Sequence, residues 1–189
     1  MEETLNRIKK LLLTPDDALR EVKTEEWSAM EAAKNYVAIV AAIPALAALI
    51  GLIGRGGFFR VLIFAALMYV MGFVNVYVLA KIMDLLAPYF GSTQTETGSF
   101  KLSAYAFTPA FVAGVLNVNP SLSTLGTLVS LYGIYILYLG LPVLMGTPEN
   151  KRVLYTLACI VAVAIVSVIM WTVIGGLAWG SGYNPWHRY

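Results

Sequence analysis

The chain has very few of the residues on which catalytic and metal sites usually depend. One His, His187, and one Cys, Cys159, occur among its 189 residues, and charged residues make up only 13%. A single thiol excludes an intramolecular disulfide, and one His with one Cys is too small a ligand set for a metal centre. The motifs of zinc hydrolases, serine hydrolases and P-loop NTPases are also absent from the sequence. We therefore expect no enzyme, no catalytic residues, no cofactor and no metal.

Two further absences narrow the range of functions. The chain has no basic patch interleaved with aromatic residues, so we do not expect nucleic acid as a partner. Its long apolar segments carry no acidic side chain near their centres, which weighs against a proton-coupled pump. Asn75 is the one strongly polar side chain deep in the second of these segments.

Apolar sequence is what the chain has in abundance. Hydrophobic residues make up 59% of it, and the stretch from Tyr36 to Trp179 is interrupted only by short polar joints. A soluble domain of this length could not bury that much apolar surface, so a lipid bilayer must act as its solvent. The alternating pattern of a membrane β-barrel is missing, whereas helices satisfy their own backbone hydrogen bonds. We predict an all-α, polytopic membrane protein.

Five segments are long enough to cross a hydrocarbon core about 30 Å thick, which takes about 20 helical residues. The third of them is short. The predicted transmembrane helices cover residues 36–53, 61–80, 102–118, 124–145 and 153–179.

The distribution of Lys and Arg predicts the orientation. Five spans place the two termini on opposite sides, and ten of the 13 basic residues fall on the amino-terminal side. Only Arg55, Arg60 and Arg188 fall on the other side. Because loops rich in Lys and Arg stay in the cytoplasm, we expect a multi-pass cell-membrane protein with a cytoplasmic amino terminus and an outer carboxyl terminus. The predicted organisation is an amphipathic cytoplasmic or interfacial segment over 1–35, a five-helix transmembrane domain over 36–179 and a short outer tail over 180–189.

The amino-terminal segment holds 14 of the 24 charged residues and begins with an amphipathic pattern. Leu5, Ile8, Leu11 and Leu12 fall at helical spacing, with basic residues between them. This pattern is typical of a helix lying on an anionic membrane surface, and equally of a helix packed on the protein's own loops. Both interpretations stay open at this point.

Capping residues indicate where three helices begin. Thr14 is predicted to cap a helix that starts with Pro15. Ser28 and Glu31 have the spacing of a capping box just ahead of the first span. Thr147 is predicted to cap the fifth span.

Small residues form a stripe along the fourth span. At about 100° per residue, one face of this helix carries Gly126, Ser130, Gly133, Leu137 and Gly140. Such stripes let helix backbones approach closely in lipid, where packing replaces the hydrophobic effect. We therefore expect a close helix contact along this face.

Tyrosines occupy the opposite face of the same span, at positions 132, 135 and 138. We expect Tyr132 and Tyr135 near mid-depth in the membrane, where each hydroxyl needs a hydrogen-bond partner. Either the hydroxyls bond to the backbone of a neighbouring helix, or they form the polar lining of a pocket or path.

Pro109 interrupts the third span. A proline inside a helix frees the carbonyl one turn earlier, here that of Tyr105. Thr108, a neighbouring helix or water can satisfy that carbonyl. A structural kink is the preferred interpretation, and a functional gate is the alternative.

Titratable side chains gather where the second span ends and the third begins. Lys81 and Asp84 lie three residues apart on one helix face, and Lys101 opens the third span. We expect Asp84 to lie between the two lysines near the headgroups, either as a cluster that sets helix depth or as part of a functional site. Cys159, inside the fifth span, is expected to be a small buried hydrophobe.

Three segments in a particular order carry a family resemblance. They are Lys81–Gly91, then Phe100–Pro109 followed by Gly114 and Pro120, then Leu131–Lys151. Together they resemble the prokaryotic branch of the Yip family of integral membrane proteins, over nearly the whole chain. The resemblance implies five spans and a cytoplasmic amino terminus. Eukaryotic relatives are tied to Rab-type GTPases, but their long amino-terminal region is missing here, so we do not expect a Rab-type GTPase partner.

Two functional hypotheses follow. The preferred one is a non-enzymatic membrane organiser, which packs with itself or with other membrane proteins, or shapes lipid. The alternative is transport of a small solute or ion through the helix bundle. The expected partners are the lipid bilayer and either a second copy or another membrane protein. The candidate functional residues are Lys81, Asp84, Lys101, Tyr105, Thr108, Pro109, Tyr132, Tyr135, Gly140, Pro142, Thr147 and Pro148.

Overall fold

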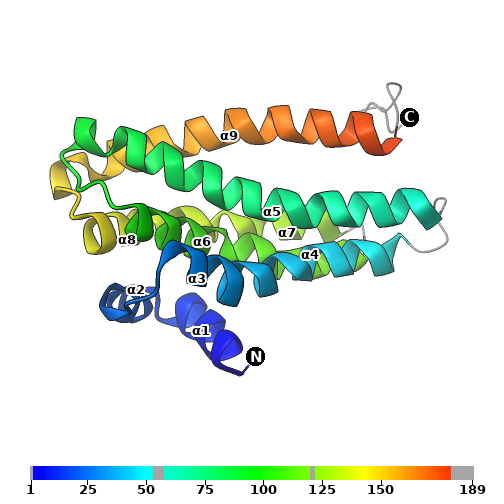
Figure 1. The fold of residues 1–189 in the computed structure, drawn as a ribbon, viewed down its shortest axis with the longest axis horizontal. Helices are drawn as coiled ribbons and strands as arrows, with labels where there is room; N and C mark the ends of the chain where they lie inside the picture. The colour runs from blue at the N-terminus through cyan, green and yellow to red at the C-terminus, as the bar shows by residue number, and fades with distance from the viewer. Residues whose placement is uncertain (1, 53–57, 120–121, 180–189) are drawn as a thin grey trace.

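The protein is an all-α bundle in the computed structural model, which describes residues 2–52, 58–119 and 122–179 (Figure 1). These residues contain no strand, and five of their helical stretches are long and apolar enough to cross a membrane. The predicted fold class, an all-α polytopic membrane protein, is confirmed. Several residues named above lie outside the described ranges, namely Arg55, Pro120, His187, Arg188 and the predicted tail over 180–189.

The helices follow one another along the chain with short connections. They are α1 (Glu2–Leu13), α2 (Pro15–Thr24), α3 (Ala29–Ala32), η1 (Ala33–Val37), α4 (Ala38–Gly51), α5 (Phe58–Leu86), η2 (Ala87–Phe90), α6 (Glu96–Ala113), η3 (Gly114–Val118), α7 (Ser123–Ser130), α8 (Tyr132–Met145) and α9 (Glu149–Trp179). The candidate spans run antiparallel in chain order, and the fourth is built from α7 and α8 together (Figure 1).

Helices α5 and α9 are longer than a hydrocarbon core. They have 29 and 31 residues, which corresponds to about 45 Å of helix, against about 30 Å of hydrocarbon. The predicted spans 61–80 and 153–179 are shorter because a search for apolar runs excludes polar end turns, such as those carrying Lys81 and Arg152. These extra turns lie at the end of the bundle where α1 and α2 are found (Figure 1).

Helix α6 is at the centre of the bundle. In its apolar window 72% of the residues are buried, compared with 17–39% in the other four candidate spans. Because its neighbours shield α6 from lipid, it accommodates buried polar side chains, among them Ser99, Lys101 and Ser103. This shielding explains why α6 has the lowest mean hydropathy of the five, 1.2, and why the sequence predicts only a short third span.

The small-residue stripe of the fourth span packs against α6, as predicted. A Cβ atom on Gly133 would lie 2.1 Å from the Ala106 carbonyl oxygen, and one on Gly140 would lie 2.2 Å from Leu102 Cδ1. The stripe therefore sets the separation of α8 and α6 within one chain. Because α6 already occupies this face, Gly133 and Gly140 cannot serve as a contact between two copies.

Helices α1 and α2, which we call the apron, lie crosswise against one end of the bundle (Figure 1). Leu11 and Leu19 are fully buried and belong to the same core as Leu102. Of the two interpretations of the amphipathic pattern, packing on the protein itself therefore accounts for the centre of the stripe. Leu5 and Leu13 are left 60% and 70% exposed. We call this end of the bundle the apron end.

The capping prediction for the first span is confirmed. The Ser28 hydroxyl accepts a hydrogen bond from the Glu31 N–H, and the Glu31 carboxylate accepts one from the Ser28 N–H. This box fixes the start of α3 and so the point where the chain turns from the apron into the membrane.

The predicted caps at Thr14 and Thr147 are wrong. The Thr14 hydroxyl donates to the Lys10 carbonyl at 3.1 Å and makes no cap bond to α2. The Thr147 hydroxyl donates to the Leu141 carbonyl at 3.1 Å. Both hydroxyls close the helix that precedes them, because a helix also ends with unpaired carbonyls that need donors.

Candidate functional site

Arg7 connects the apron to the central helix. Its guanidinium donates hydrogen bonds to the Glu25 carboxylate at 2.6 Å and to the Tyr105 hydroxyl at 2.8 Å. The side chains of Arg7 and Glu25 are only 14% and 17% exposed. A single cation thus joins α1, the segment after α2, and α6.

The surroundings of Arg7 keep it charged. The guanidinium lies 4.5 Å from the centre of the Trp27 ring, within range of a cation–π contact. Burial acts to lower the pKa of Arg7, but the hydrogen bond to Glu25 and the nearby Tyr105 outweigh it, and the pKa is raised above its ordinary value. Trp27 therefore covers an internal cation.

Lys101 is a second buried cation at this junction. Its side chain enters the core from α6, where the residue is 5% exposed, and its ammonium donates to the Glu25 backbone carbonyl at 2.6 Å. Glu25 thus receives Arg7 on its carboxylate and Lys101 on its carbonyl. Two cations from different helices fix the same residue, which holds the apron in place.

The predicted position of Asp84 between Lys81 and Lys101 is wrong. The Asp84 carboxylate accepts a hydrogen bond from the Ser99 hydroxyl at 2.5 Å, and Lys81 instead pairs with Glu96 at 3.0 Å. Residues two apart on a helix point about 200° apart. Ser99 and Lys101 therefore face opposite sides of α6, one toward α5 and the other toward the apron.

Thr108 and Pro109 are buried in the middle of α6. The Thr108 hydroxyl lies 2.8 Å from the Tyr36 hydroxyl and donates to the Ala104 carbonyl at 3.0 Å. Of the predicted partners for the Tyr105 carbonyl, Thr108 is therefore not the one used. The Tyr36 and Tyr105 rings pack 4.9 Å apart, so this region is a closed aromatic and hydroxyl network.

Tyr132 and Tyr135 lie beside the apron. The Tyr132 hydroxyl donates to the Leu12 carbonyl at 3.2 Å, and both tyrosines line a hollow with Asp16 and Asp17. For Tyr132 the first interpretation is confirmed, since its hydroxyl bonds to the backbone of a neighbouring helix.

The connection between α8 and α9 packs against the connection between α5 and α6. Gly146 adopts a left-handed φ of 63° at the end of α8, one turn after Pro142. The Thr93 N–H donates to the Met145 carbonyl at 2.8 Å, and the Thr147 and Ser92 hydroxyls are also 2.8 Å apart. Pro148 lies next to this contact, 3.6 Å from the position of a Cβ on Gly91.

These residues form separate clusters at one end of the bundle. Lys101 and Tyr105 belong to the apron junction, Asp84 to the α5–α6 contact, and Thr147 and Pro148 to the joints. Among the described residues, no group of His, Cys, Asp and Glu is placed to hold a metal ion. Chemically, the clusters supply hydrogen bonds and ion pairs that hold helices together.

A family model for the Yip1 domain matches residues 9–179. The chain belongs to the Yip1 domain family. The match extends from the apron to the end of α9, so it includes all five candidate spans and the joints that carried the resemblance. The family assignment made from those joints is thereby confirmed. No curated protein and no solved structure matches the chain.

In this Yip1 domain, the sequence predictions missed Arg7, Glu25 and Ser99 as connecting residues. Arg7 lies four positions before Leu11 and therefore on nearly the same face of α1 as that buried leucine. A cation on the apolar face is a signal that it has an internal partner. Nothing in the sequence indicates that the partners are Glu25 and Tyr105.

Proposed function

We propose that this Yip1 domain protein is a non-enzymatic membrane organiser that shapes the lipid around its apron end. The observation that carries the proposal is the pair of exposed leucines on α1. Leu5 and Leu13 are 60% and 70% exposed, although the helix between them is packed into the core. Apolar side chains at the level of the membrane interface lower their free energy by entering lipid.

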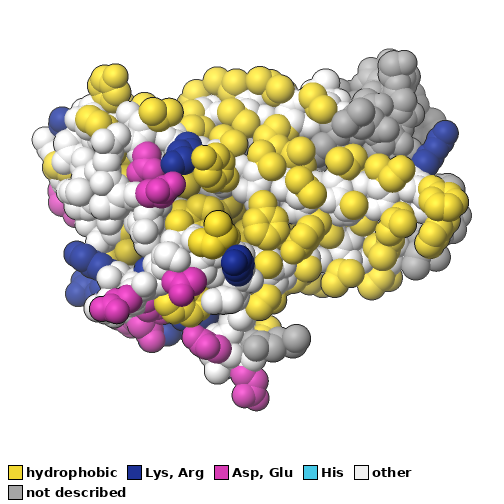
Figure 2. Space-filling view, in the orientation of Figure 1, with side chains coloured by type: hydrophobic (Ala, Val, Ile, Leu, Met, Phe, Trp, Pro, Cys, Tyr) yellow, Lys and Arg dark blue, Asp and Glu magenta, His cyan; other side chains and the backbone are white. Residues whose placement is uncertain are grey.

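Charge at the apron end supports contact with a membrane surface. Most of the charged side chains visible in Figure 2 gather there, next to the apolar belt that covers the bundle. Lys9, Arg20 and Lys23 are exposed on α1 and α2. An amphipathic helix with exposed basic residues binds anionic lipid through both apolar burial and charge.

The shape of the molecule supports an effect on curvature. The apron widens the protein beside one end of the bundle only (Figure 1). A protein that occupies more area in one leaflet than in the other acts as a wedge, and the bilayer relieves this mismatch by bending. The concentration of Lys and Arg at the apron end favours a cytoplasmic location for the wider end, in a cell membrane.

Vesicle shape tests this proposal. The full chain would be reconstituted into vesicles of phosphatidylcholine with phosphatidylglycerol and imaged by electron cryomicroscopy. We expect narrower vesicles or tubules with the wild type, and vesicles of ordinary diameter with the double variant Leu5→Glu and Leu13→Glu. Asn6→Glu, an exposed change on the same helix, is the matched control. Wild-type vesicles with the diameter of empty ones would overturn the proposal.

The alternative, transport of a small solute or ion, has less support. Its predicted residues are engaged in separate contacts, because Lys101 bonds to Glu25, Asp84 to Ser99 and Thr108 to Tyr36. Flux across reconstituted vesicles that Asp84→Asn abolishes would favour transport over the organiser.

A further inference from the structure

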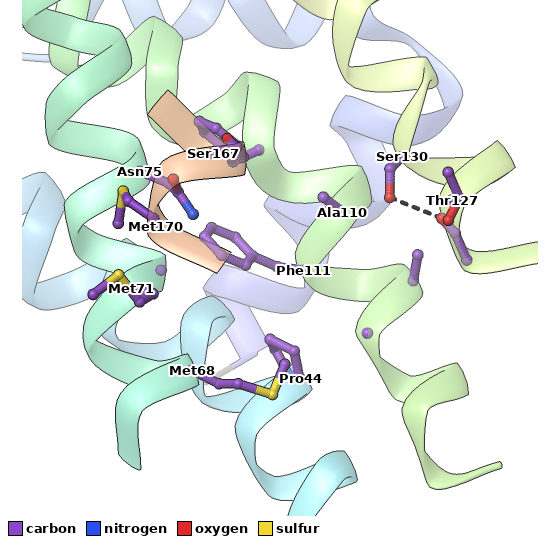
Figure 3. Close-up of a pocket in the computed structure, with 15 residues that line it drawn as sticks. Pro44, Met68, Met71, Asn75, Ala110, Phe111, Thr127, Ser130, Ser167 and Met170 are labelled. Atoms are coloured by element: carbon purple, nitrogen blue, oxygen red, sulfur yellow. Dashed lines mark hydrogen bonds between the residues drawn. The ribbon is translucent and has the colours of Figure 1, made fainter. Parts of the chain in front are cut away.

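A cavity of about 410 Å³ lies within the bundle, among α4, α5, α6, α7 and α9 (Figure 3). Its wall is mostly apolar and includes Phe111 and three methionines, Met68, Met71 and Met170. Ligand sites in proteins have this size and this balance of apolar wall with a few polar groups. Methionine side chains are flexible and polarizable, so they adapt to the shape of a bound molecule.

Four polar side chains line this cavity, those of Asn75, Thr127, Ser130 and Ser167. The Ser130 hydroxyl donates to the Gly126 carbonyl at 2.8 Å. Asn75 of α5 points into the cavity, and Ser167 of α9 lies on the same side (Figure 3). Within the described residues, the side chains of Asn75 and Ser167 have no hydrogen-bond partner. An unpaired side-chain amide in the hydrocarbon region costs free energy. We therefore expect a bound molecule to supply the hydrogen-bond partner of Asn75.

The depth of Asn75 limits the kind of partner. Asn75 lies six residues before Lys81 on the same helix, which is about 9 Å further into the membrane. Lys81 pairs with Glu96 near the interface, so ester carbonyls of ordinary phospholipids lie well above Asn75.

A second, smaller cavity of about 230 Å³ adjoins the first. The two share Phe107, Ala110 and Ser130 in their walls. The second cavity is lined by apolar side chains such as Leu137 and Val163. Together they form one site, with the Asn75 and Ser167 side chains in the first cavity and an apolar extension in the second.

We propose that this site binds a neutral, lipid-soluble molecule whose carbonyl or hydroxyl oxygen bonds to Asn75 and Ser167 and whose apolar chain occupies the second cavity. Neutrality follows from the walls, since no Asp, Glu, Lys, Arg or His among the described residues lines either cavity. The chemistry fits a prenylated quinone and a long-chain isoprenoid alcohol. Both dissolve in the bilayer and can reach the site from it.

Native mass spectrometry of the full chain in detergent tests the proposal. The probes are a short prenylated benzoquinone, farnesol and phosphatidylglycerol, each titrated separately. We expect one equivalent of benzoquinone or farnesol to bind. The probe with the higher affinity shows whether the site prefers a quinone carbonyl or an alcohol hydroxyl. Failure of both probes to bind, or phosphatidylglycerol binding in their place, would overturn the proposal.

Variants locate the bound molecule. Asn75→Leu removes the amide at similar volume and should weaken binding about tenfold, the effect of one buried hydrogen bond. Ala110→Phe fills the junction of the two cavities and should abolish binding. Thr172→Val, on the exposed side of α9, is the control and should bind like the wild type. Equal affinity for Asn75→Leu and wild type would contradict the proposed site.

The melting temperature of the ligand-free protein is the second measurement. Because Asn75 has no partner in the bundle, Asn75→Leu should leave the melting temperature unchanged or raise it. A marked fall would show that the amide serves the fold and would overturn its role as a ligand group. Neither measurement depends on vesicle shape, so this proposal and the organiser proposal can fail independently.

Discussion

The Arg7 guanidinium donates a hydrogen bond to the Tyr105 hydroxyl at 2.8 Å, across 98 positions of sequence. This contact ties the first helix of the chain to the central helix of the bundle. Arg7 also bonds to Glu25 and stacks on Trp27, so it is, with Lys101, one of the two cations that hold the apron in place. The proposed organiser function requires such a link, because it needs the two amphipathic helices held at a fixed place on the bundle.

Replacing Arg7 should release the apron. Arg7→Met retains most of the apolar stem but leaves the Glu25 carboxylate without its partner, at a cost of about 2 kcal/mol. We expect faster amide hydrogen exchange in α1 and α2, with the exchange of α6 unchanged. Lys10→Met is the matched control, because the Lys10–Glu21 pair is exposed. Equal rates of amide hydrogen exchange in α1 of the two variants would show that Arg7 does not hold the apron.

The close contact of α8 with α6 makes Gly133 sensitive to any added atom. In Gly133→Ala the new Cβ would overlap the Ala106 carbonyl oxygen, and such overpacking costs about 1–3 kcal/mol. The melting temperature in detergent should fall clearly. In Gly126→Ala, on the same stripe, the new Cβ would lie 3.5 Å from the Ala113 carbonyl oxygen, an ordinary contact, so the melting temperature should stay near the wild-type value. Equal values for both variants would contradict the packing.

The partner of Asp84 can be established by double-mutant cycles. Asp84→Ala with Ser99→Ala should give a coupling energy of about 1–2 kcal/mol, because these side chains share a hydrogen bond. Asp84→Ala with Lys101→Met should be additive within about 0.5 kcal/mol, because Lys101 faces the apron. A larger coupling with Lys101 than with Ser99 would restore the arrangement expected from the sequence.

The Lys10–Glu21 pair between α1 and α2 should depend on pH. The hydrogen bond and charge of Lys10 hold the pKa of the Glu21 carboxyl below its ordinary value. The pair therefore stabilises the apron fully above the unfolded pKa of about 4.3, and this contribution is lost as the pH falls through the lower folded value. NMR titration of the labelled carboxyl should show its pKa rising in Lys10→Ala. An unchanged pKa would mean that the pair does not form in solution.

Features set by the spacing of residues on one helix were predicted correctly, and those set by the arrangement of different helices were not. The Ser28–Glu31 box and the stripe of Gly133 and Gly140 were predictable, because each follows from the spacing of residues on one helix. The partner of Asp84 was not, because it depends on the rotation of α6 about its axis. The contact of Tyr132 with Leu12 was not predictable either, because the apron covers part of the fourth span, which no local pattern records.

The sequence alone determined that this chain is a membrane protein, that its spans are helices and that it belongs to the Yip1 domain family. These properties follow from apolar content, segment length and local motifs, which folding does not alter. Only the tertiary structure decided that Arg7 and Lys101 meet at Glu25, that α6 is shielded from lipid, and that Asn75 opens into a cavity. Each of these depends on which helix faces which, and in lipid that choice is made by close packing and hydrogen bonds between residues far apart in the chain.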